Sequence, residues 1–535
     1  MTPTSICRKN VFLVMTILFI LVICGELNAA TYYIPDNFSN LRAACAGISA
    51  GDTIIIRDGT YSGSNNYMDD SHLPPSGSTG SYTTIKAEHD GMAIFPDGFL
   101  RMQSNISRSY IRIEGIKSLY KTEILSWNHC KFLRCAFTHE TSGQSDDPVF
   151  GIGDQCSYIL LEDCWAWGAG RYKFLAYGAS AGNTHHIIFR RCVTRFDRVN
   201  SYSPMANFSI YRANQVALQN CIAIDGDQDQ FWVAYEERGG AFYTHHGSQD
   251  TIINGCIVLN HKSYGFGGAP NSGLSVNNTV VWGASQGSWM RCDQGITSTT
   301  FSGLTLGHMR SVTGVQSQQA YGILTWGGSI TLGINNSILT DINANYAMDG
   351  YELLSNYNTL YNNNANFSSS GGPAGANDYC SNNSNAIDPL DGSPGNGIAS
   401  LKYLPRVETG SNNDGTGSNG VDRGATILYK IGISGTYYGE TGWNTVTSDP
   451  LWPWPNENRI RTDMRAYSYT GTTYNGTSST LSGARGFCAD GQTLSKYIWE
   501  YLGNTIPTDI YGNSSSEPTD TTPPASPSGI TVIIQ

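Results

Sequence analysis

The sequence predicts an all-β solenoid, in which short coils of the chain stack along one axis. First, a phrase of apolar residues, one or two polar residues and a cysteine or other small residue returns repeatedly between residues 110 and 358. Second, the small residue recurs at a nearly fixed period: Cys135, Cys164, Cys192 and Cys221 lie 29, 28 and 29 residues apart, and Cys256 follows 35 later. Third, each phrase is of the β type and not helical, which at this period is typical of a solenoid.

Four copies of the phrase are strong, and weaker copies extend the pattern in both directions. The strong copies are residues 159–164, 187–192, 216–221 and 252–256. Later copies carry Thr, Leu, Ser or Asn in place of cysteine, and earlier coils are expected at 82–87 and 110–116. An Asn, Gly or Asp just before the small residue suits a tight turn with a left-handed backbone. We therefore expect the small residues to form an inward-facing column, the thiol column.

Composition and charge narrow the class of protein and of partner. The chain has 60 Gly, 11% aromatic and only 14% charged residues, which favours turns and strands over surface helices. Its net charge of −11 argues against a nucleic-acid partner, because phosphate binding needs clustered Lys and Arg. The net charge is only weak evidence against an acidic polysaccharide as the partner, since a local basic groove can lie on an acidic protein.

Three segments carry a resemblance to a known superfamily. Residues 41–61 look like an opening in which a capping helix precedes the first strand, residues 78–87 resemble the next coil, and residues 421–427 resemble a closing phrase. On these motifs and the repeat, the chain resembles the right-handed parallel β-helix proteins of the pectin-lyase-like superfamily, over about residues 31–430. The superfamily includes many polysaccharide lyases and glycosidases, so the resemblance is specific for fold and unspecific for reaction.

The N-terminus has the form of a secretory signal peptide, residues 1–30. Arg8 and Lys9 precede the apolar run 11–24, and residues 27–30 offer small side chains for cleavage. A lipid anchor at Cys24 is the competing interpretation. No other segment is apolar and long enough to cross a bilayer. We expect an exported protein that is secreted, periplasmic or at the cell surface.

The remaining chain divides into three parts. Residues 31–425 are expected to form the β-helix, with its long loops and a Gly/Asn/Ser-rich closing stretch. Residues 426–512 predict a small mixed appendage with a helix near 492–502, folded back over the C-terminal end of the solenoid to cover an open sheet edge. Residues 513–535 form a Pro/Thr/Ser linker and tail.

Most of the thirteen cysteines are expected to be buried thiols and not disulfides. Residues that share one position of a repeat stack on one another and behave as small hydrophobic groups. Cys380 and Cys488 lie outside the repeat and could pair with each other. Spacings typical of a zinc site are absent from the sequence.

The long loops after Cys164, Cys192 and Cys221 lead into strands expected at 172–177, 207–212 and 241–246. Stacked as neighbours, these strands would present bases and cations on one outer face. In lyases of the resembled superfamily, a Lys, Arg or His on such a face removes the proton α to a uronate carboxyl, while a cation or Ca²⁺ neutralises the carboxylate. The candidate catalytic residues are Lys173, Arg212 and His245. Alternatively, such charges are solvated and paired with acids of the next coil.

The same loops supply candidate ligands for sugar and for metal. Aromatic side chains that could stack on sugars are Trp165, Trp167, Tyr172, Tyr177, Trp232 and Tyr235, and the alternative is that they pack loops against the coil wall. Alternating carboxylates suit Ca²⁺, and the candidates are Asp225, Asp227 and Asp229. The pattern lacks a glutamate at the bidentate position of a calcium loop, so a solvated acidic loop, or pairing with Arg195, Arg198 and Arg238, is the alternative.

The leading functional hypothesis is an exported β-helix protein that acts on polysaccharide, as a lyase cleaving a uronate-containing glycan by β-elimination. A non-catalytic glycan-binding or structural protein of the cell surface or matrix is the alternative, and the C-terminal linker fits it. Inverting hydrolysis by Asp163 and Asp197 would need carboxylates about 6.5–9.5 Å apart. Signatures of the polygalacturonase and pectate-lyase branches are not found in the sequence, and nor are P-loop or Gly-x-Ser-x-Gly motifs.

Overall fold

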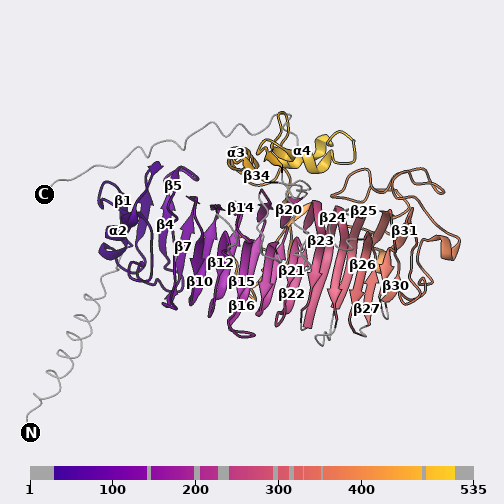
Figure 1. The fold of residues 1–535 in the computed structure, drawn as a ribbon, viewed down its shortest axis with the longest axis horizontal. Helices are drawn as coiled ribbons and strands as arrows, with labels where there is room; N and C mark the ends of the chain where they lie inside the picture. The colour runs from indigo at the N-terminus through magenta and orange to yellow at the C-terminus, as the bar shows by residue number, and fades with distance from the viewer. Residues whose placement is uncertain are drawn as a thin grey trace, which may run out of the picture.

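The computed structural model describes residues 29–140, 146–197, 205–226, 240–270, 272–292, 299–311, 319–328, 331–350, 353–472 and 477–511. Most of these residues form one elongated stack of coils whose strands run across the long axis (Figure 1). Within the described residues, 31 strands join a single sheet and pair in parallel from coil to coil. The parallel β-helix predicted by the sequence is confirmed. Almost all of the predicted signal peptide and the linker lie outside the described residues.

Each complete coil contributes strands to three faces, which we call the first, second and third faces in chain order. The first face is built by β1 (Thr31–Ile34), β2 (Thr53–Ile56), β4 (Thr83–Ala87), β6 (Arg108–Ser109), β7 (Ile111–Glu114), β10 (Trp127–Leu133), β13 (Ser157–Glu162), β16 (Thr184–Arg190), β19 (Ala213–Gln219), β22 (Gln249–Asn254), β27 (Leu332–Asn335) and β30 (Leu353–Asn356). The second face is built by β3 (Gly59–Thr60), β5 (Ala93–Phe95), β8 (Ile116–Ser118), β11 (Ala136–His139), β14 (Trp165–Gly168), β17 (Val193–Arg195), β20 (Ile222–Gly226), β28 (Ile338–Ile342) and β31 (Thr359–Tyr361).

The third face is built by β9 (Thr122–Ile124), β12 (Phe150–Ile152), β15 (Tyr172–Tyr177), β18 (Ala206–Tyr211), β21 (Phe242–Thr244), β26 (Tyr321–Trp326) and β29 (Met348–Asp349). Three long strands continue through the corners and join the faces: β23 (Ile257–Gly268), β24 (Ser272–Arg291) and β25 (Thr299–Met309). The expected helix follows β1, which is already a strand of the stack, and precedes β2. This helix, α2 (Leu41–Gly47), is capped by the side chain of Asn40, which accepts a hydrogen bond from the Ala43 amide at 2.9 Å.

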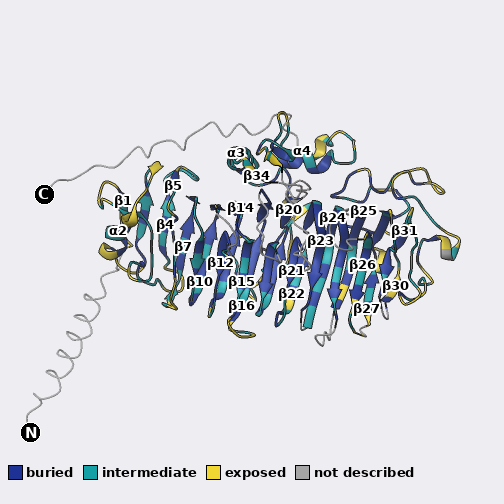
Figure 2. Ribbon diagram, in the orientation of Figure 1, coloured by how far each residue is buried: buried dark blue, intermediate teal, exposed yellow. Residues whose placement is uncertain are grey.

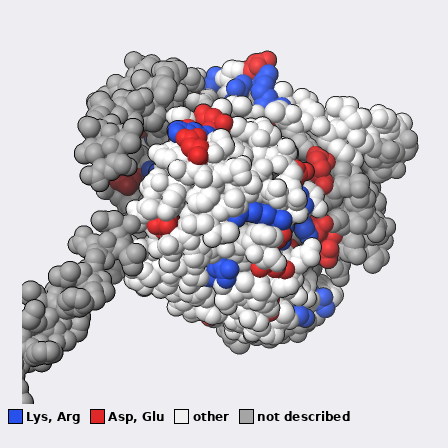
Figure 3. Space-filling model, turned by 90° about the vertical axis from the view of Figure 1, so that its left-hand side faces the viewer, with Lys and Arg blue, Asp and Glu red and all other residues white. Residues whose placement is uncertain are grey.

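The N-terminal end of the stack carries few charged groups. Viewed from that end, most of the visible surface is uncharged, and Lys, Arg, Asp and Glu side chains are scattered over it (Figure 3). Arg57, for example, pairs with Asp36 at 2.6 Å and also with Glu88. A surface of mixed sign gives this end no field that would attract a polyanion.

The turn before the thiol column has the predicted left-handed backbone. Asp163, Arg191, Asn220 and Gly255 have φ values of 56°, 51°, 49° and 65°. The thiols that follow, Cys135, Cys164, Cys192, Cys221 and Cys256, are all 0% exposed and unpaired. Cys380 and Cys488 are also buried and form no disulfide with each other, contrary to the pairing considered for them. The column behaves as the sequence predicts.

A second internal column fixes which side chains of the third face point outward. Phe150, Phe174, Phe208 and Phe242 occupy matching positions in successive coils, with neighbouring ring centroids 6.2, 5.4 and 5.3 Å apart. Buried residues fill the strands along the whole stack, and exposed ones gather in the loops (Figure 2). Because side chains alternate along a strand, inward phenylalanines direct the residues one and three positions later outward.

The C-terminal appendage lies along the middle of the stack and not over its end (Figure 1). It contains β32 (Tyr429–Ile431), β33 (Val446–Pro450), α3 (Glu457–Arg465), β34 (Tyr469–Thr472), β35 (Ser478–Leu481) and α4 (Leu494–Trp499). The predicted position over the C-terminal end is therefore wrong. The outer side of the second face carries large apolar side chains, and the appendage buries them in a second core that includes Trp165, Ile222, Ile257, Trp454 and Met464.

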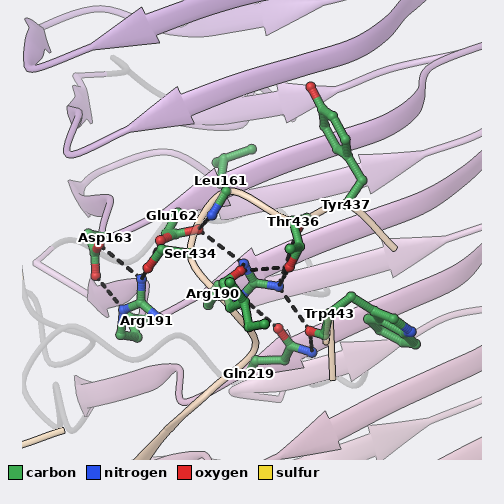
Figure 4. Close-up of polar contacts among 12 residues, drawn as sticks. Leu161, Glu162, Asp163, Arg190, Arg191, Gln219, Ser434, Thr436, Tyr437 and Trp443 are labelled. Carbon is green, nitrogen blue, oxygen red and sulfur yellow. Dashed lines mark hydrogen bonds and ion pairs between the residues drawn. The ribbon is translucent and has the colours of Figure 1, made fainter. Parts of the chain in front are cut away.

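An internal ion cluster ties one segment of the appendage, the strap (433–444), to the first face (Figure 4). Arg190 is 0% exposed and donates hydrogen bonds to the carbonyls of Ile433 and Trp443 at 2.9 and 3.0 Å. Glu162 pairs with Arg190 at 3.1 Å and with Arg191. Burial acts to raise the pKa of Glu162, but the two arginines outweigh it and hold this pKa below its usual value. Among the described residues, no helix is long and apolar enough to span a bilayer.

Candidate functional site

The outer side of the third face carries a row of rings in register. Tyr177 pairs with Tyr211, and His245 follows Thr244, which pairs with Ile210. The rings of Tyr177 and Tyr211 stack 5.5 Å apart, and those of Tyr211 and His245 lie 4.5 Å apart. We call Tyr177, Tyr211 and His245 the aromatic row. All three are partly exposed.

Three arginines from different coils lie over aromatic rings on this side. The Arg212 guanidinium lies 5.0 Å from the centre of the Tyr211 ring, and it donates to the Ala179 carbonyl at 2.8 Å. Arg171 lies 4.8 Å from the Tyr172 ring, and Arg291 lies 5.3 Å from the Trp326 ring. Such cation–π contacts hold a guanidinium beside an aromatic ring and so help to fix its position.

The electrostatic field of these arginines converges on His245. Partial burial, together with the charges of His246, Arg171, Arg212 and Arg291, lowers the pKa of His245 to about 3. The ring is therefore neutral at neutral pH. Its Nδ1 accepts a hydrogen bond from the His246 amide at 2.8 Å, which leaves the proton on Nε2. His245 thus presents a hydrogen-bond donor within a positive field, although the whole chain is acidic.

Lys173 does not share this surface. Its side chain is 0% exposed, its Nζ donates to the Gly170 carbonyl at 2.7 Å, and it lies 4.1 Å from the Phe196 ring. Burial lowers the pKa of Lys173 to about 7, against the opposing effect of Asp197. Asn207, its counterpart in the next coil, is buried as well. The expectation that Lys173 lies on the outer face with Arg212 and His245 is wrong, because its side chain is fully buried beside Gly170 and Phe196.

The two predicted tryptophans lie beneath the appendage. Trp165 and Trp167 are 0% and 2% exposed. The Trp165 Nε1 donates to the Asp463 carboxylate at 2.9 Å, and Arg459 lies 4.7 Å from its ring. They belong to the outer side of the second face, which the appendage covers, so no ring face is left for a sugar. The packing alternative describes their position.

The remaining predicted aromatic residues are Tyr172, Tyr177, Trp232 and Tyr235. Tyr172 is 8% exposed and packs in a buried group with Tyr243 and Tyr264, below Arg171. Trp232 and Tyr235 lie outside the described residues. Of the six predicted sugar-stacking residues, Tyr177 is the one that the structure describes on the exposed aromatic row.

One of the three predicted calcium ligands, Asp225, lies within the described residues. Asp225 is buried at the end of β20, where its Oδ1 accepts a hydrogen bond from the Asn260 amide at 3.2 Å. Burial raises the pKa of Asp225, against Arg485 and Arg195, which lie close enough to lower it. A carboxylate that faces arginines and an amide donor is poorly suited to a hard cation. Asp227 and Asp229 lie outside the described residues, and we derive no step through calcium.

The two carboxylates considered for hydrolysis are both held by arginines. Asp163 accepts from Arg191 at 2.7 Å. Asp197 is 1% exposed and pairs with Arg195 at 2.7 Å and with Arg485 at 3.0 Å. Neither carboxylate is available to activate a water, so this arrangement does not favour inverting hydrolysis.

Some residues of the third face were not predicted from the sequence. Trp326, at the end of β26, is 55% exposed, and Arg291 lies against its ring. Arg291 and Trp326 occupy matching positions of adjacent coils. The sequence does suggest a strand here, because the largely apolar run 321–326 ends in Trp326 and is followed by two glycines. Without coil boundaries, however, the sequence does not place this run on the same face as His245.

Comparison with known proteins finds similar solved structures only. No family model matches the sequence, and no curated protein does. Pectate lyase Pel9A is 16% identical, with 75% of this chain and 97% of that chain covered and a TM-score of 0.41. An alginate lyase from Paenibacillus sp. str. FPU-7 is 14% identical (63% and 99% covered, TM-score 0.34). A mannuronic acid specific polysaccharide family 6 lyase from human gut microbiota is 12% identical (64% and 82% covered, TM-score 0.37). These scores are too low to identify corresponding residues, and they assign no reaction to this chain.

Proposed function

We propose that this protein binds an acidic, uronate-containing polysaccharide along the outer side of the third face. The observation that supports the proposal is the convergence of Arg171, Arg212 and Arg291, from separate coils, on His245. Guanidinium groups bind carboxylates through two parallel hydrogen bonds, and aromatic rings pack against the apolar side of a sugar. An acidic glycan would meet both kinds of group on this face.

The size of the surface suits a polymer. Five coil steps separate Tyr177 from Trp326, through Tyr211, His245 and the strands that carry Arg291. At about 4.8 Å a step, the surface extends roughly 24 Å along the axis. A ligand of that length spans several sugar residues, so the arginines would meet carboxylates of different residues in one chain.

We further propose that the bound chain is cleaved by β-elimination. Arg212 and the Nε2–H of His245 would hold the uronate carboxylate, which makes the neighbouring C5 proton more acidic. A base removes this proton, the electron pair forms the C4–C5 double bond, and the C4–O bond breaks with a proton delivered to the leaving oxygen. Tyr211 is our candidate for the proton transfer, because its ring lies between Tyr177 and His245 and against Arg212.

The experiment is an ultraviolet assay for the unsaturated product on alginate, pectate and glycosaminoglycans, with binding measured in parallel. We expect Tyr211→Phe to abolish product formation with binding retained. Arg212→Ala should weaken binding about 10- to 100-fold, the loss expected for a charge-assisted contact. Lys402→Ala, an exposed cation of residues 366–425, is the matched control and should change neither property.

A non-catalytic glycan-binding protein is the second candidate function. The observation that favours it is the position of Lys173, since burial removes the one predicted lysine from the exposed surface. Binding that depends on Arg212, without product from any uronate polymer, would support this second function and reject the lyase. Absence of binding to every acidic glycan would reject both.

A further inference from the structure

The last coil of the solenoid ends in a pocket that does not include the arginines of the third face. Its volume is about 390 Å³, near the lower end of the range of roughly 300–1,000 Å³ for small-molecule pockets. It lies where the chain turns after β31, and the opposite wall is formed by Ser381 and Ala386 of the closing stretch.

The pocket is lined by uncharged polar groups and aromatic rings. Its lining includes the four asparagines of 362–364 and 366, together with Tyr361 and Phe367. The lining contains no Lys, Arg, His, Asp or Glu. Its chemistry therefore differs from that of the third face, which is rich in arginine.

Two of the asparagines hold the pocket in shape. The Asn363 Oδ1 accepts from the Ile342 amide at 3.2 Å, while its Nδ2 donates to the Leu339 carbonyl at 3.0 Å and to the Asn366 Oδ1 at 3.1 Å. Asn366 in turn donates to the Ser381 hydroxyl at 3.4 Å. A ligand would thus meet a floor that is already ordered, which reduces the entropy lost on binding.

Other polar groups of the lining remain available to a ligand. Among the described residues, the Asn362 side chain makes no hydrogen bond, and this residue is exposed with a φ of 53°. The Asn364 Nδ2 donates to the Asn345 carbonyl at 3.0 Å, which leaves its Oδ1 as an acceptor. The half-buried Tyr361 is also part of the lining.

We propose that this pocket binds a neutral sugar residue. A carboxamide places a donor beside an acceptor, which complements two adjacent sugar hydroxyls, and the rings of Tyr361 and Phe367 suit the apolar side of a sugar. A uronate is disfavoured, because burying its carboxylate among neutral groups has a large desolvation cost. The inference rests on this pocket and does not require that the third face binds a uronate.

The test is calorimetric titration of the full chain with neutral cello-, xylo-, manno- and galacto-oligosaccharides. We expect one of these classes to bind, and Asn362→Gly and Tyr361→Phe each to weaken it about five- to tenfold, as for one or two lost hydrogen bonds. Glycine keeps the left-handed backbone of residue 362, so the first variant changes only the side chain. Asn419→Gly, at an exposed asparagine with a φ of 58° outside the pocket, should leave the affinity unchanged.

Three outcomes would overturn the proposal. No neutral oligosaccharide binds, or one binds with equal affinity to the wild type, Asn362→Gly and Tyr361→Phe. In the third outcome, the Arg212→Ala variant no longer binds the neutral oligosaccharide, which would place that sugar on the third face. If the Arg212→Ala variant loses binding of the uronate polymer but still binds the neutral oligosaccharide, the two ligands occupy separate sites.

Discussion

His245 is the residue on which the charges of the third face act together. Its ring contacts Tyr211, and the fields of Arg171, Arg212 and Arg291 all oppose its protonation. A bound carboxylate would offset these fields and raise the pKa of His245. The pKa of His245 therefore indicates whether an anion is bound among the arginines.

The first prediction concerns the pH dependence of stability. The pKa of His245 is about 3 in the folded protein, against a usual value of 6.5. Between these values the unfolded chain binds the proton more readily, so the stability that comes from the neutral ring is complete above pH 6.5 and is lost as pH falls toward 3. We expect the melting temperature of the wild type to fall more steeply over this range than that of His245→Gln. Parallel curves for the two proteins would contradict the assignment.

At this scale the sequence predicts some site residues and misplaces others. Tyr177, Arg212 and His245 follow strand-like segments after the thiol column, and the structure places them on one exposed surface. Lys173 is not exposed because its ammonium group bonds the Gly170 carbonyl and lies beside the Phe196 ring, contacts that the spacing of the sequence does not predict. Trp165 is not exposed for sugar stacking, because Asp463 and Arg459, about 300 residues later in the chain, pack against it.

Among the elements, the thiol column is the one that repeats most regularly. The side chains of Cys164, Cys192 and Cys221 have no exposed surface, and burial raises the pKa of each thiol well above its usual value. The thiolate is the reactive form of cysteine, so these residues should be inert in the folded protein.

The second prediction is that iodoacetamide at pH 8 does not label the thiol column in the native protein. Peptide mapping by mass spectrometry distinguishes each cysteine from the others. The same treatment in guanidinium chloride should label all five residues of the column and provides the control. Labelling of the Cys192 peptide under native conditions would show that the column is accessible.

The strap is the element most dependent on a single side chain. Arg190 donates to three of its carbonyls, those of Ile433, Thr436 and Trp443, and to the Gln219 side chain at 2.8 Å while pairing with Glu162. Removing the guanidinium would leave these buried oxygen atoms without their hydrogen-bond donor. It would also remove one of the two arginines that pair with the Glu162 carboxylate. Buried pairs broken in this way lose about 3–5 kcal/mol of stability.

The third prediction follows from this contact. Arg190→Met should lower the free energy of unfolding by about 3–5 kcal/mol in urea titrations and increase proteolysis within residues 433–444. Arg57→Ala, which breaks an ion pair with Asp36 at a 39% exposed side chain, serves as the control and should cost about 1 kcal/mol or less. A change in Arg190→Met as small as in the control would show that the strap is held by its apolar contacts.

For the whole molecule, the architecture is the most predictable feature. Regular recurrence of a small residue fixes one corner of every coil, and the fold follows because neighbouring coils must share their strands. The repeat does not predict where the appendage packs. Its position depends on matching Trp454 and Met464 to an apolar patch of the second face, which no spacing in the sequence records.

The faces of the molecule therefore have different roles in our account. The appendage buries much of the second face, the strap binds to the first, and the third keeps rings and arginines exposed. This division leaves one side of the stack for a long acidic ligand.

A crystal structure of the full chain with a bound oligouronate tests this account most directly. We predict a sugar over Tyr211 with its carboxylate within hydrogen-bonding distance of Arg212 and of the His245 Nε2. An oligouronate bound on another face, or crystals with no sugar on the third face at saturating concentration, would contradict it.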